Sequence, residues 1–88
     1  MIERTVTVNN RAGIHARPAA LIVQTAGKFQ SKIFLKKETE EINAKSIMGI
    51  ITLGAAYGTE LQLCVEGDDE EEAAESIAKL FDDRFEEE

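Results

Sequence analysis

Residues 60–66 and 70–82 read ELQLCVE and EEEAAESIAKLFD, and their hydrophobic residues recur with different periods. In the first segment every second residue is apolar, which predicts a strand with one buried face formed by Leu61, Leu63 and Val65. In the second segment the apolar residues recur every three or four positions, which predicts a helix buried along Ala74, Ile77, Leu80 and Phe81. We expect Asp68 and Asp69 to cap the first turn of this helix.

The same two periods organise the rest of the chain. They predict further strands at residues 2–8, 31–37 and 40–43. They also predict helices at residues 18–26 and 47–53, which end at Gly27 and Gly54. The resulting order is βαββαβα, an α+β fold. Because each element has one apolar face, we expect two layers, with all helices on one side of the sheet and the other sheet face largely uncovered.

Charge is distributed unevenly along the 88 residues, whose formal net charge is -7. Residues 1–65 contain eight Lys or Arg against five Asp or Glu, whereas residues 66–88 contain two against twelve. The first part is therefore able to attract an acidic partner, and the overall acidity argues against binding nucleic acid. We expect the acidic run at residues 82–88 to be a solvated, frayed chain end.

Length and composition indicate one small domain that spans residues 1–88. A chain of this size has little area for an enclosed cavity, which favours chemistry at the surface. Cys64 is the only cysteine, so no internal disulfide is expected, and one histidine with one cysteine is too few for the usual zinc site. The sequence predicts no leader peptide and has no run of about 20 apolar residues. We therefore expect a cytoplasmic protein that does not insert into a membrane.

The segment from Gly13 to Pro18 places the imidazole of His15 and the guanidinium of Arg17 at a predicted loop-to-helix junction. A helix amino terminus presents unpaired backbone N–H groups, and an arginine donates paired hydrogen bonds to phosphate oxygens. Histidine is a suitable phosphoryl acceptor because a ring nitrogen is nucleophilic. The residues alone also allow simpler roles, namely a surface or capping histidine and a solvated arginine.

A second segment of interest begins at Ser46, before the short predicted helix at residues 47–53. The Ser46 hydroxyl is suited to capping this helix and, if exposed, to being phosphorylated. The helix carries more apolar side chains than one face of two turns buries: Ile47, Met48, Ile50 and Ile51. The sequence allows either a partly packed helix or an exposed patch that binds protein partners.

Two motifs, GIHARPA at residues 13–19 and KSIMG at residues 45–49, resemble those of the HPr family of phosphocarriers in the bacterial sugar phosphotransferase system. The resemblance covers nearly the whole chain, because the length, the order of elements and the separation of the two motifs all match. It implies an open-faced β-sandwich, in which four antiparallel strands in the order 1-4-2-3 carry three helices on one face.

The resemblance also implies an activity, that of a phosphoryl carrier rather than an enzyme. Phospho-Enzyme I would pass its phosphoryl group to Nδ1 of His15, with assistance from Arg17, and His15 would pass it to Enzyme IIA. No metal or cofactor is implied. Some members carry hydroxyl or amide side chains at the positions of Ala12 and Ala16. In this chain, backbone N–H groups must make those contacts.

The resemblance further implies partners for a monomeric chain. Its docking surface would include Ala20, Ile47, Met48 and Ile51. Ser46 would be phosphorylated by HPr kinase/phosphorylase, and catabolite control protein A would be a further partner. The alternative is a regulatory binding protein or corepressor of the same fold that acts mainly through phosphorylated Ser46. Regulators such as Crh lack the active histidine, so His15 argues against that as the only role. A ferredoxin-like RNA-binding module shares much of the element order, but the chain lacks its aromatic motif.

Overall fold

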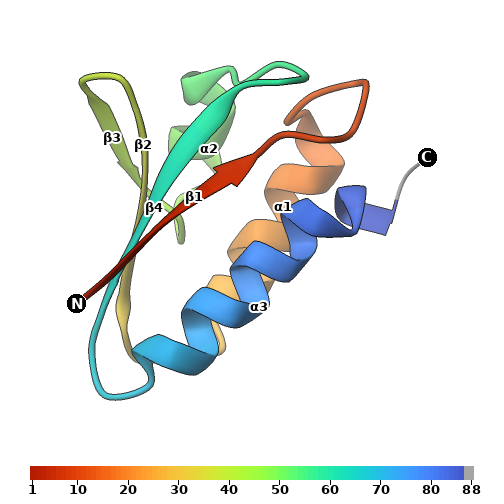
Figure 1. The fold of residues 1–88 in the computed structure, drawn as a ribbon. Helices are drawn as coiled ribbons and strands as arrows, with labels where there is room; N and C mark the ends of the chain where they lie inside the picture. The colour runs from red at the N-terminus through yellow and green to blue at the C-terminus, as the bar shows by residue number, and fades with distance from the viewer. Residues whose placement is uncertain (87–88) are drawn as a thin grey trace.

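The computed structural model describes residues 1–86, and it has the predicted order of elements (Figure 1). The strands are β1 (Ile2–Thr7), β2 (Lys32–Lys37), β3 (Glu40–Asn43) and β4 (Glu60–Glu66). The helices are α1 (Ala16–Ala26), α2 (Ile47–Leu53) and α3 (Glu70–Asp82), followed by the short 3-10 turn η1 (Arg84–Glu86). The predicted βαββαβα fold is confirmed.

The four strands form one antiparallel sheet in the order β1-β4-β2-β3, as the family resemblance implied. Strand β4 lies in the interior of the sheet, where Val65 pairs with Ile2 of β1 on one side and with Ile33 of β2 on the other. Strand β3 pairs only with β2, and Leu35 is opposite Ile42 in that pair. Strands β1 and β3 therefore form the two edges of the sheet (Figure 1).

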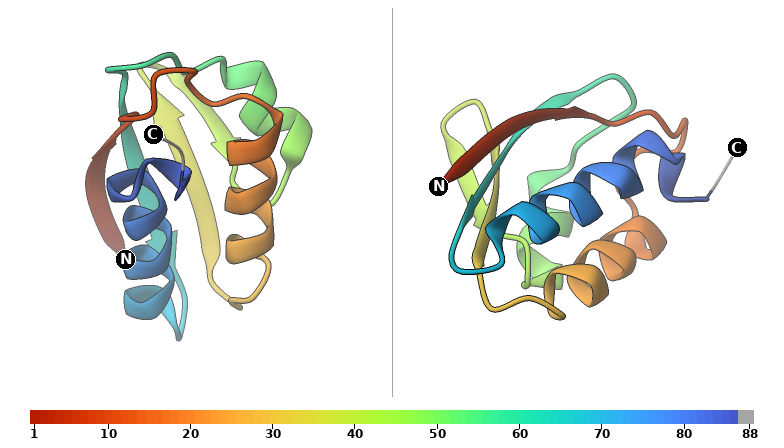
Figure 2. Two further views of the ribbon diagram at one scale, coloured as in Figure 1. Left: turned by 90° about the vertical axis from the view of Figure 1, so that its right-hand side faces the viewer. Right: turned by 60° about the horizontal axis from the view of Figure 1, so that its bottom comes forward.

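The helices cover one face of this sheet (Figure 2). Helices α1 and α3 pack against each other, and α3 also packs across β1 and β4. The core is built from the inward side chains of the strands, such as Leu61 and Leu63, and from Ile22 and Ile77 of the helices, all no more than 2% exposed. The period-two and period-3.6 patterns in the sequence thus mark the two sides of one hydrophobic core.

Three predicted helix ends are confirmed, and each has a local cause. The side chain of Ser46 caps α2 by accepting a hydrogen bond from the Gly49 N–H at 3.1 Å. Gly54 ends α2 in a left-handed conformation with φ of 64°, which glycine adopts at little steric cost. Gly27 ends α1, although in a right-handed conformation. Helix α1 begins two residues before Pro18, so the proline lies in its first turn.

The predicted capping role of Asp69 is wrong. Asp69 occupies the position before α3, but its carboxylate makes no bond to that helix. Instead it accepts hydrogen bonds from the backbone N–H of Gln30 at 2.8 Å, from the backbone N–H of Ser31 at 3.0 Å and from the Ser31 hydroxyl. These bonds, led by that from the hydroxyl, lower the pKa of the Asp69 carboxyl. The side chain therefore ties the start of α3 to the turn between α1 and β2.

The expectation of a frayed carboxy-terminal end is also wrong for the described part of residues 82–88. Phe85 is fully buried, and its ring meets that of Phe81 edge-on with centroids 4.9 Å apart. An aromatic residue among acidic ones thus anchors the end of the chain. Residues 87 and 88 lie outside the described part. Leu80 was expected in the buried stripe of α3 but is only half-buried at the edge of the core.

None of the helices within residues 1–86 is both long enough and apolar enough to span a membrane.

Candidate functional site

The loop before His15 is held in one conformation by backbone contacts to a second loop. Gly13 has φ of 75°, and a Cβ atom there would lie 2.9 Å from the carbonyl oxygen of Ala55. The next N–H, that of Ile14, donates to the same carbonyl at 2.9 Å. The Asn10 side chain donates to the Gly13 carbonyl at 2.6 Å and closes the turn. Only glycine combines this positive φ with such a close approach of two backbones.

His15 is the residue before the first turn of α1, and its side chain is exposed. Its backbone is extended, with φ of -97° and ψ of -165°, and its carbonyl accepts the first helical bond from the Ala19 N–H at 3.0 Å. Pro18 has no N–H, so the first-turn donors without an intrahelical acceptor are those of Ala16 and Arg17. The imidazole therefore stands beside two outward-facing N–H groups at the positive end of the helix dipole.

The other predicted residues of this site are exposed around the same helix start. Arg17 is exposed in the first turn of α1, where its guanidinium can reach an anion held near His15. Ala12 and Ala16 are also exposed, and their methyl groups offer no hydrogen bond. Backbone N–H groups and one guanidinium are thus the donors that this site presents to a phosphoryl group.

Helix α2 presents the expected apolar patch, formed by Ile47, Met48 and Ile51. Their exposed fractions are 41%, 67% and 41%, whereas Ile50 on the opposite side is 1% exposed. Helix α2, which carries the patch, packs against α1, the helix that begins directly after His15 (Figure 2). Ala20, the remaining predicted docking residue, is half-buried on α1.

Ser46 lies at the amino end of α2, next to this apolar patch. Its side chain is exposed, and its oxygen accepts the Gly49 N–H while the hydroxyl proton remains free to donate. Lys45, which precedes it, donates from Nζ to the Phe29 carbonyl at 2.9 Å. The hydroxyl is therefore at the surface. The backbone on either side of it is held by the bond from the Ser46 N–H to the Asn43 carbonyl and by the bond from the Ile50 N–H to the Ser46 carbonyl.

Sequence reasoning missed the residues that support the site, namely Asn10 and Ala55. Neither carries reactive chemistry. The Asn10 side-chain amide donates a hydrogen bond to the Gly13 carbonyl, and Ala55 acts through its backbone carbonyl. The asparagine before a glycine-containing loop was a signal for a local turn, since asparagine side chains often bond to nearby backbone. No side-chain pattern marks the carbonyl of Ala55.

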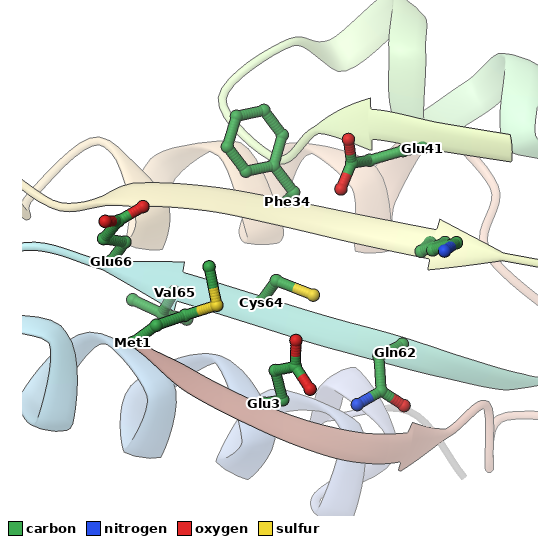
Figure 3. A pocket seen from close by; sticks show the side chains of 9 residues that line it. Met1, Glu3, Phe34, Glu41, Gln62, Cys64, Val65 and Glu66 are labelled. Atoms are coloured by element: carbon green, nitrogen blue, oxygen red, sulfur yellow. The ribbon is translucent and has the colours of Figure 1, made fainter.

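The uncovered face of the sheet holds a separate hollow of about 370 Å³ around Cys64 and Phe34 (Figure 3). Burial raises the pKa of the Cys64 thiol, and the nearby carboxylates of Glu3 and Glu41 raise it further. Such a thiol is protonated at neutral pH and is a poor nucleophile. Cys64 faces away from the helical layer that carries His15, so the two residues form no catalytic pair (Figure 3).

Comparisons with known proteins show which family this chain belongs to. Residues 2–83 match the family model described as PTS HPr component phosphorylation site. The chain belongs to the HPr family. The phosphocarrier protein HPr of Treponema pallidum is 57% identical to it over 88 residues, which cover all of both chains.

Two solved structures of HPr relatives have the same fold. HPr-C-His from Thermoanaerobacter tengcongensis is 51% identical, with a TM-score of 0.96 over 100% of this chain and 99% of that one. Crh, a catabolite repression protein of Bacillus subtilis, is 44% identical, with a TM-score of 0.77 over 94% of this chain and 95% of that one. That Crh structure is a dimer with a swapped domain. Membership of the HPr family implies a non-catalytic phosphoryl carrier of the phosphotransferase system that interacts with Enzyme I and Enzyme IIA.

Proposed function

We propose that residues 1–88 act as one HPr domain that accepts a phosphoryl group from phospho-Enzyme I on His15 and donates it to Enzyme IIA. The observation that carries this proposal is the exposed imidazole at the start of α1, beside the open N–H groups of Ala16 and Arg17. In the first transfer, Nδ1 of His15 bonds to phosphorus as the bond from phosphorus to Enzyme I breaks. In the second, the acceptor on Enzyme IIA displaces His15. The chain is restored and needs no cofactor for either step.

The surroundings of His15 are suited to stabilising charge on the transferred group. The helix start supplies N–H donors that are already oriented, so little reorganisation is required during transfer. Arg17 adds a forked donor whose hydrogen bonds matter most while the phosphoryl group moves between proteins. The rigid loop at Gly13 keeps His15 in place relative to those donors.

We assign the docking of both partners to Ile47, Met48 and Ile51 of α2, together with Ala20 of α1. Exposed apolar side chains beside the reactive group allow one surface to bind several partners through adaptable contacts. Residues 1–65 carry more basic than acidic side chains, which favours partners with acidic surfaces. The proposed location of these reactions is the cytoplasm, and the proposed state of the chain is a monomer.

We also assign Ser46 as a regulatory phosphorylation site for HPr kinase/phosphorylase. A phosphate there adds about -1.5 to -2 charge beside Ile47 and Met48. Docking would then require desolvation of that charge and its approach to acidic partner surfaces. A hundredfold loss of transfer corresponds to about 2.8 kcal/mol, a size that one misplaced charge at an interface supplies.

The test of the carrier role is a relay assay with phosphoenolpyruvate, the cognate Enzyme I and the cognate Enzyme IIA. We expect no label on Enzyme IIA with His15→Ala and a rate about 100-fold below wild type with Arg17→Ala. Arg4→Ala is the matched control. It also removes one guanidinium, but the Arg4 side chain pairs with Glu75 of α3 and does not lie at the start of α1. Label reaching Enzyme IIA through His15→Ala would refute the carrier proposal.

The test of regulation compares Ser46→Asp with Ser46→Ala in the same assay. We expect Ser46→Asp to slow transfer and Ser46→Ala to leave it near wild type. Thr5→Asp is the control, since it places the same charge at an exposed position of β1, opposite Gln62, on the sheet face away from α2. Equal rates in all variants, or failure of the kinase to modify the wild-type chain, would refute the assignment.

A second candidate function is regulatory binding through phosphorylated Ser46, with catabolite control protein A as the partner. The observation that favours it is the similarity to Crh, a catabolite repression protein. The measurement is binding of catabolite control protein A to the phosphorylated chain carrying His15→Ala. Binding would support a regulatory role that is independent of transfer, and binding that is no tighter than that of the unphosphorylated chain would refute it.

A further inference from the structure

A polar hollow of about 290 Å³ lies on the surface between three separate segments of the chain. It is lined by Asn9, Arg11, Tyr57 and Arg84, which come from the loop after β1, the loop before β4 and η1. Two guanidinium groups, one phenol and one amide are all able to donate hydrogen bonds. Within residues 1–86 neither arginine forms an ion pair, so their donors face the hollow or solvent.

The backbone that carries Arg84 has an uncommon conformation. Arg84, Phe85 and Glu86 have φ values of 56°, 54° and 63°, three consecutive left-handed residues without a glycine. Side chains disfavour this conformation, so it persists only where surrounding contacts compensate for it. Burial of the Phe85 ring against Phe81 is that contact. The same arrangement holds the backbone of Arg84 beside the hollow, which Arg11 also lines.

The two loops on the other side of the hollow are held by hydrogen bonds of their own. Arg11 lies in a turn closed by the bond from the Gly13 N–H to the Asn10 carbonyl, at 3.1 Å. Tyr57 lies in a loop closed by a bond from the Ala56 N–H to the Thr59 hydroxyl oxygen, at 3.2 Å. The backbones that carry Arg11 and Tyr57 are therefore held in place before any ligand binds, so binding does not require the loops themselves to become ordered.

We propose that Asn9, Arg11, Tyr57 and Arg84 form a second anion site, which binds the phosphate group of a small phosphorylated metabolite. The hollow is near the lower limit of small-molecule sites in volume. Two guanidinium forks on separate segments, together with a phenol and an amide, match a tetrahedral dianion better than the planar oxygens of one carboxylate. The site shares no residue with the proposed phosphoryl site or docking patch, so this inference goes beyond the proposed function.

The experiment is a titration of the ¹⁵N-labelled chain with inorganic phosphate and, separately, with glycerol 3-phosphate, followed by backbone amide shifts. We expect the amides of Arg11, Tyr57 and Arg84 to shift together and to saturate with one dissociation constant. Arg11→Gln and Arg84→Gln should each weaken that binding about tenfold or more, since each removes a charged fork. Lys32→Ala removes an exposed charge at the opposite end of the sheet and should leave the constant unchanged.

Three controls distinguish the other sources of a shift. Arg17→Gln should leave the response at Arg11 and Arg84 intact, and its loss would mean that phosphate binds only at the His15 site. Acetate should bind more weakly than phosphate, and equal binding would overturn the assignment to a phosphate group. Tighter binding of glycerol 3-phosphate than of inorganic phosphate would indicate an ester as ligand, whereas equal constants would indicate the free anion. If phosphate shifts these amides in Arg11→Gln and in Arg84→Gln as it does in wild type, the site is refuted.

Discussion

Replacing Gly13 with alanine should disturb both stability and the position of His15. Gly13 has φ of 75°, and its missing Cβ atom would lie 2.9 Å from the Ala55 carbonyl oxygen and 3.2 Å from Cα of Ala56. Both contacts are to backbone, which cannot move aside as the end of a flexible side chain does. The same carbonyl accepts the Ile14 N–H, so any shift that relieves the clash also weakens that bond.

Gly58 provides a matched control for the size of the effect. Its φ is 87°, but a Cβ atom there would meet nothing within 4 Å. Gly58→Ala should therefore lose only the backbone preference, about 1–2 kcal/mol of unfolding free energy. Gly13→Ala should lose a similar amount plus about 1–3 kcal/mol for the overpacked contact. The difference between the two variants isolates the contact between the loops.

The assay is urea denaturation of wild type, Gly13→Ala and Gly58→Ala, combined with the rate of phosphorylation by Enzyme I. We expect Gly13→Ala to be the less stable variant and the slower phosphoryl acceptor, because its loop no longer places His15 at the helix start. Equal loss of stability in the two variants would refute the steric argument. A wild-type phosphorylation rate in Gly13→Ala would refute the link between this contact and His15.

Three further variants test other parts of the structure. Met48→Asp should weaken Enzyme I binding, measured by calorimetry, with less than about 1 kcal/mol loss of unfolding free energy, because Met48 is 67% exposed. A larger loss in urea denaturation would mean that Met48 belongs to the core. Asp69→Asn should be destabilising at neutral pH but not in acid. The pKa of Asp69 in the folded chain lies below its unfolded value of 3.8. The stability that its carboxylate contributes is therefore complete above pH 3.8 and is lost as pH falls through the folded pKa. A wild-type advantage that persists in strong acid would contradict this cause. Phe85→Ala should lower the unfolding free energy by about 3–5 kcal/mol, because the Phe85 ring is fully buried. A loss below about 1 kcal/mol in thermal unfolding would mean that the carboxy-terminal turn is not packed.

The fold was predictable because the sequence repeats one simple pattern in each element. Residues such as Leu61, Leu63 and Val65 alternate strictly, and the apolar positions of α3 recur at helical spacing. Periodicity identifies the buried face of each element but not its neighbour in the sheet. The strand order 1-4-2-3 therefore came from the family motifs, and the structure confirms it.

The errors have a common physical cause, which is that tertiary contacts override local preferences. Asp69 stands where a capping residue is expected, but Gln30 and Ser31, nearly forty positions earlier, supply the donors for its carboxylate. Phe85 lies in an acidic run that looks solvated, yet Phe81 provides a buried partner one helical turn before it. The donors to Asp69 are distant in the chain, and the contact of Phe85 with Phe81 needs a left-handed backbone that no glycine marks, so neither leaves a local signal in the sequence.

Part of the candidate site was likewise predictable from the sequence, and part was not. The sequence indicated that His15, Arg17 and Ser46 lie at helix starts, and the structure does place them there. The roles expected for them came from the family resemblance. The exposure of some apolar side chains on α2 was predictable, because the helix carries more of them than one face of two turns can bury. The bond from Asn10 to Gly13 is a local turn that the sequence could have indicated, whereas the contact with the Ala55 carbonyl depends on the approach of two loops, which only the structure shows.

The most direct test of the central claim, that His15 is the phosphoryl acceptor, is the intact mass of the chain after incubation with phosphoenolpyruvate and Enzyme I. We predict a gain of one phosphoryl group that is stable in base, is lost in mild acid, and is absent in a folded His15→Ala variant. The same mass gain in His15→Ala, or a gain that survives mild acid, would contradict the claim.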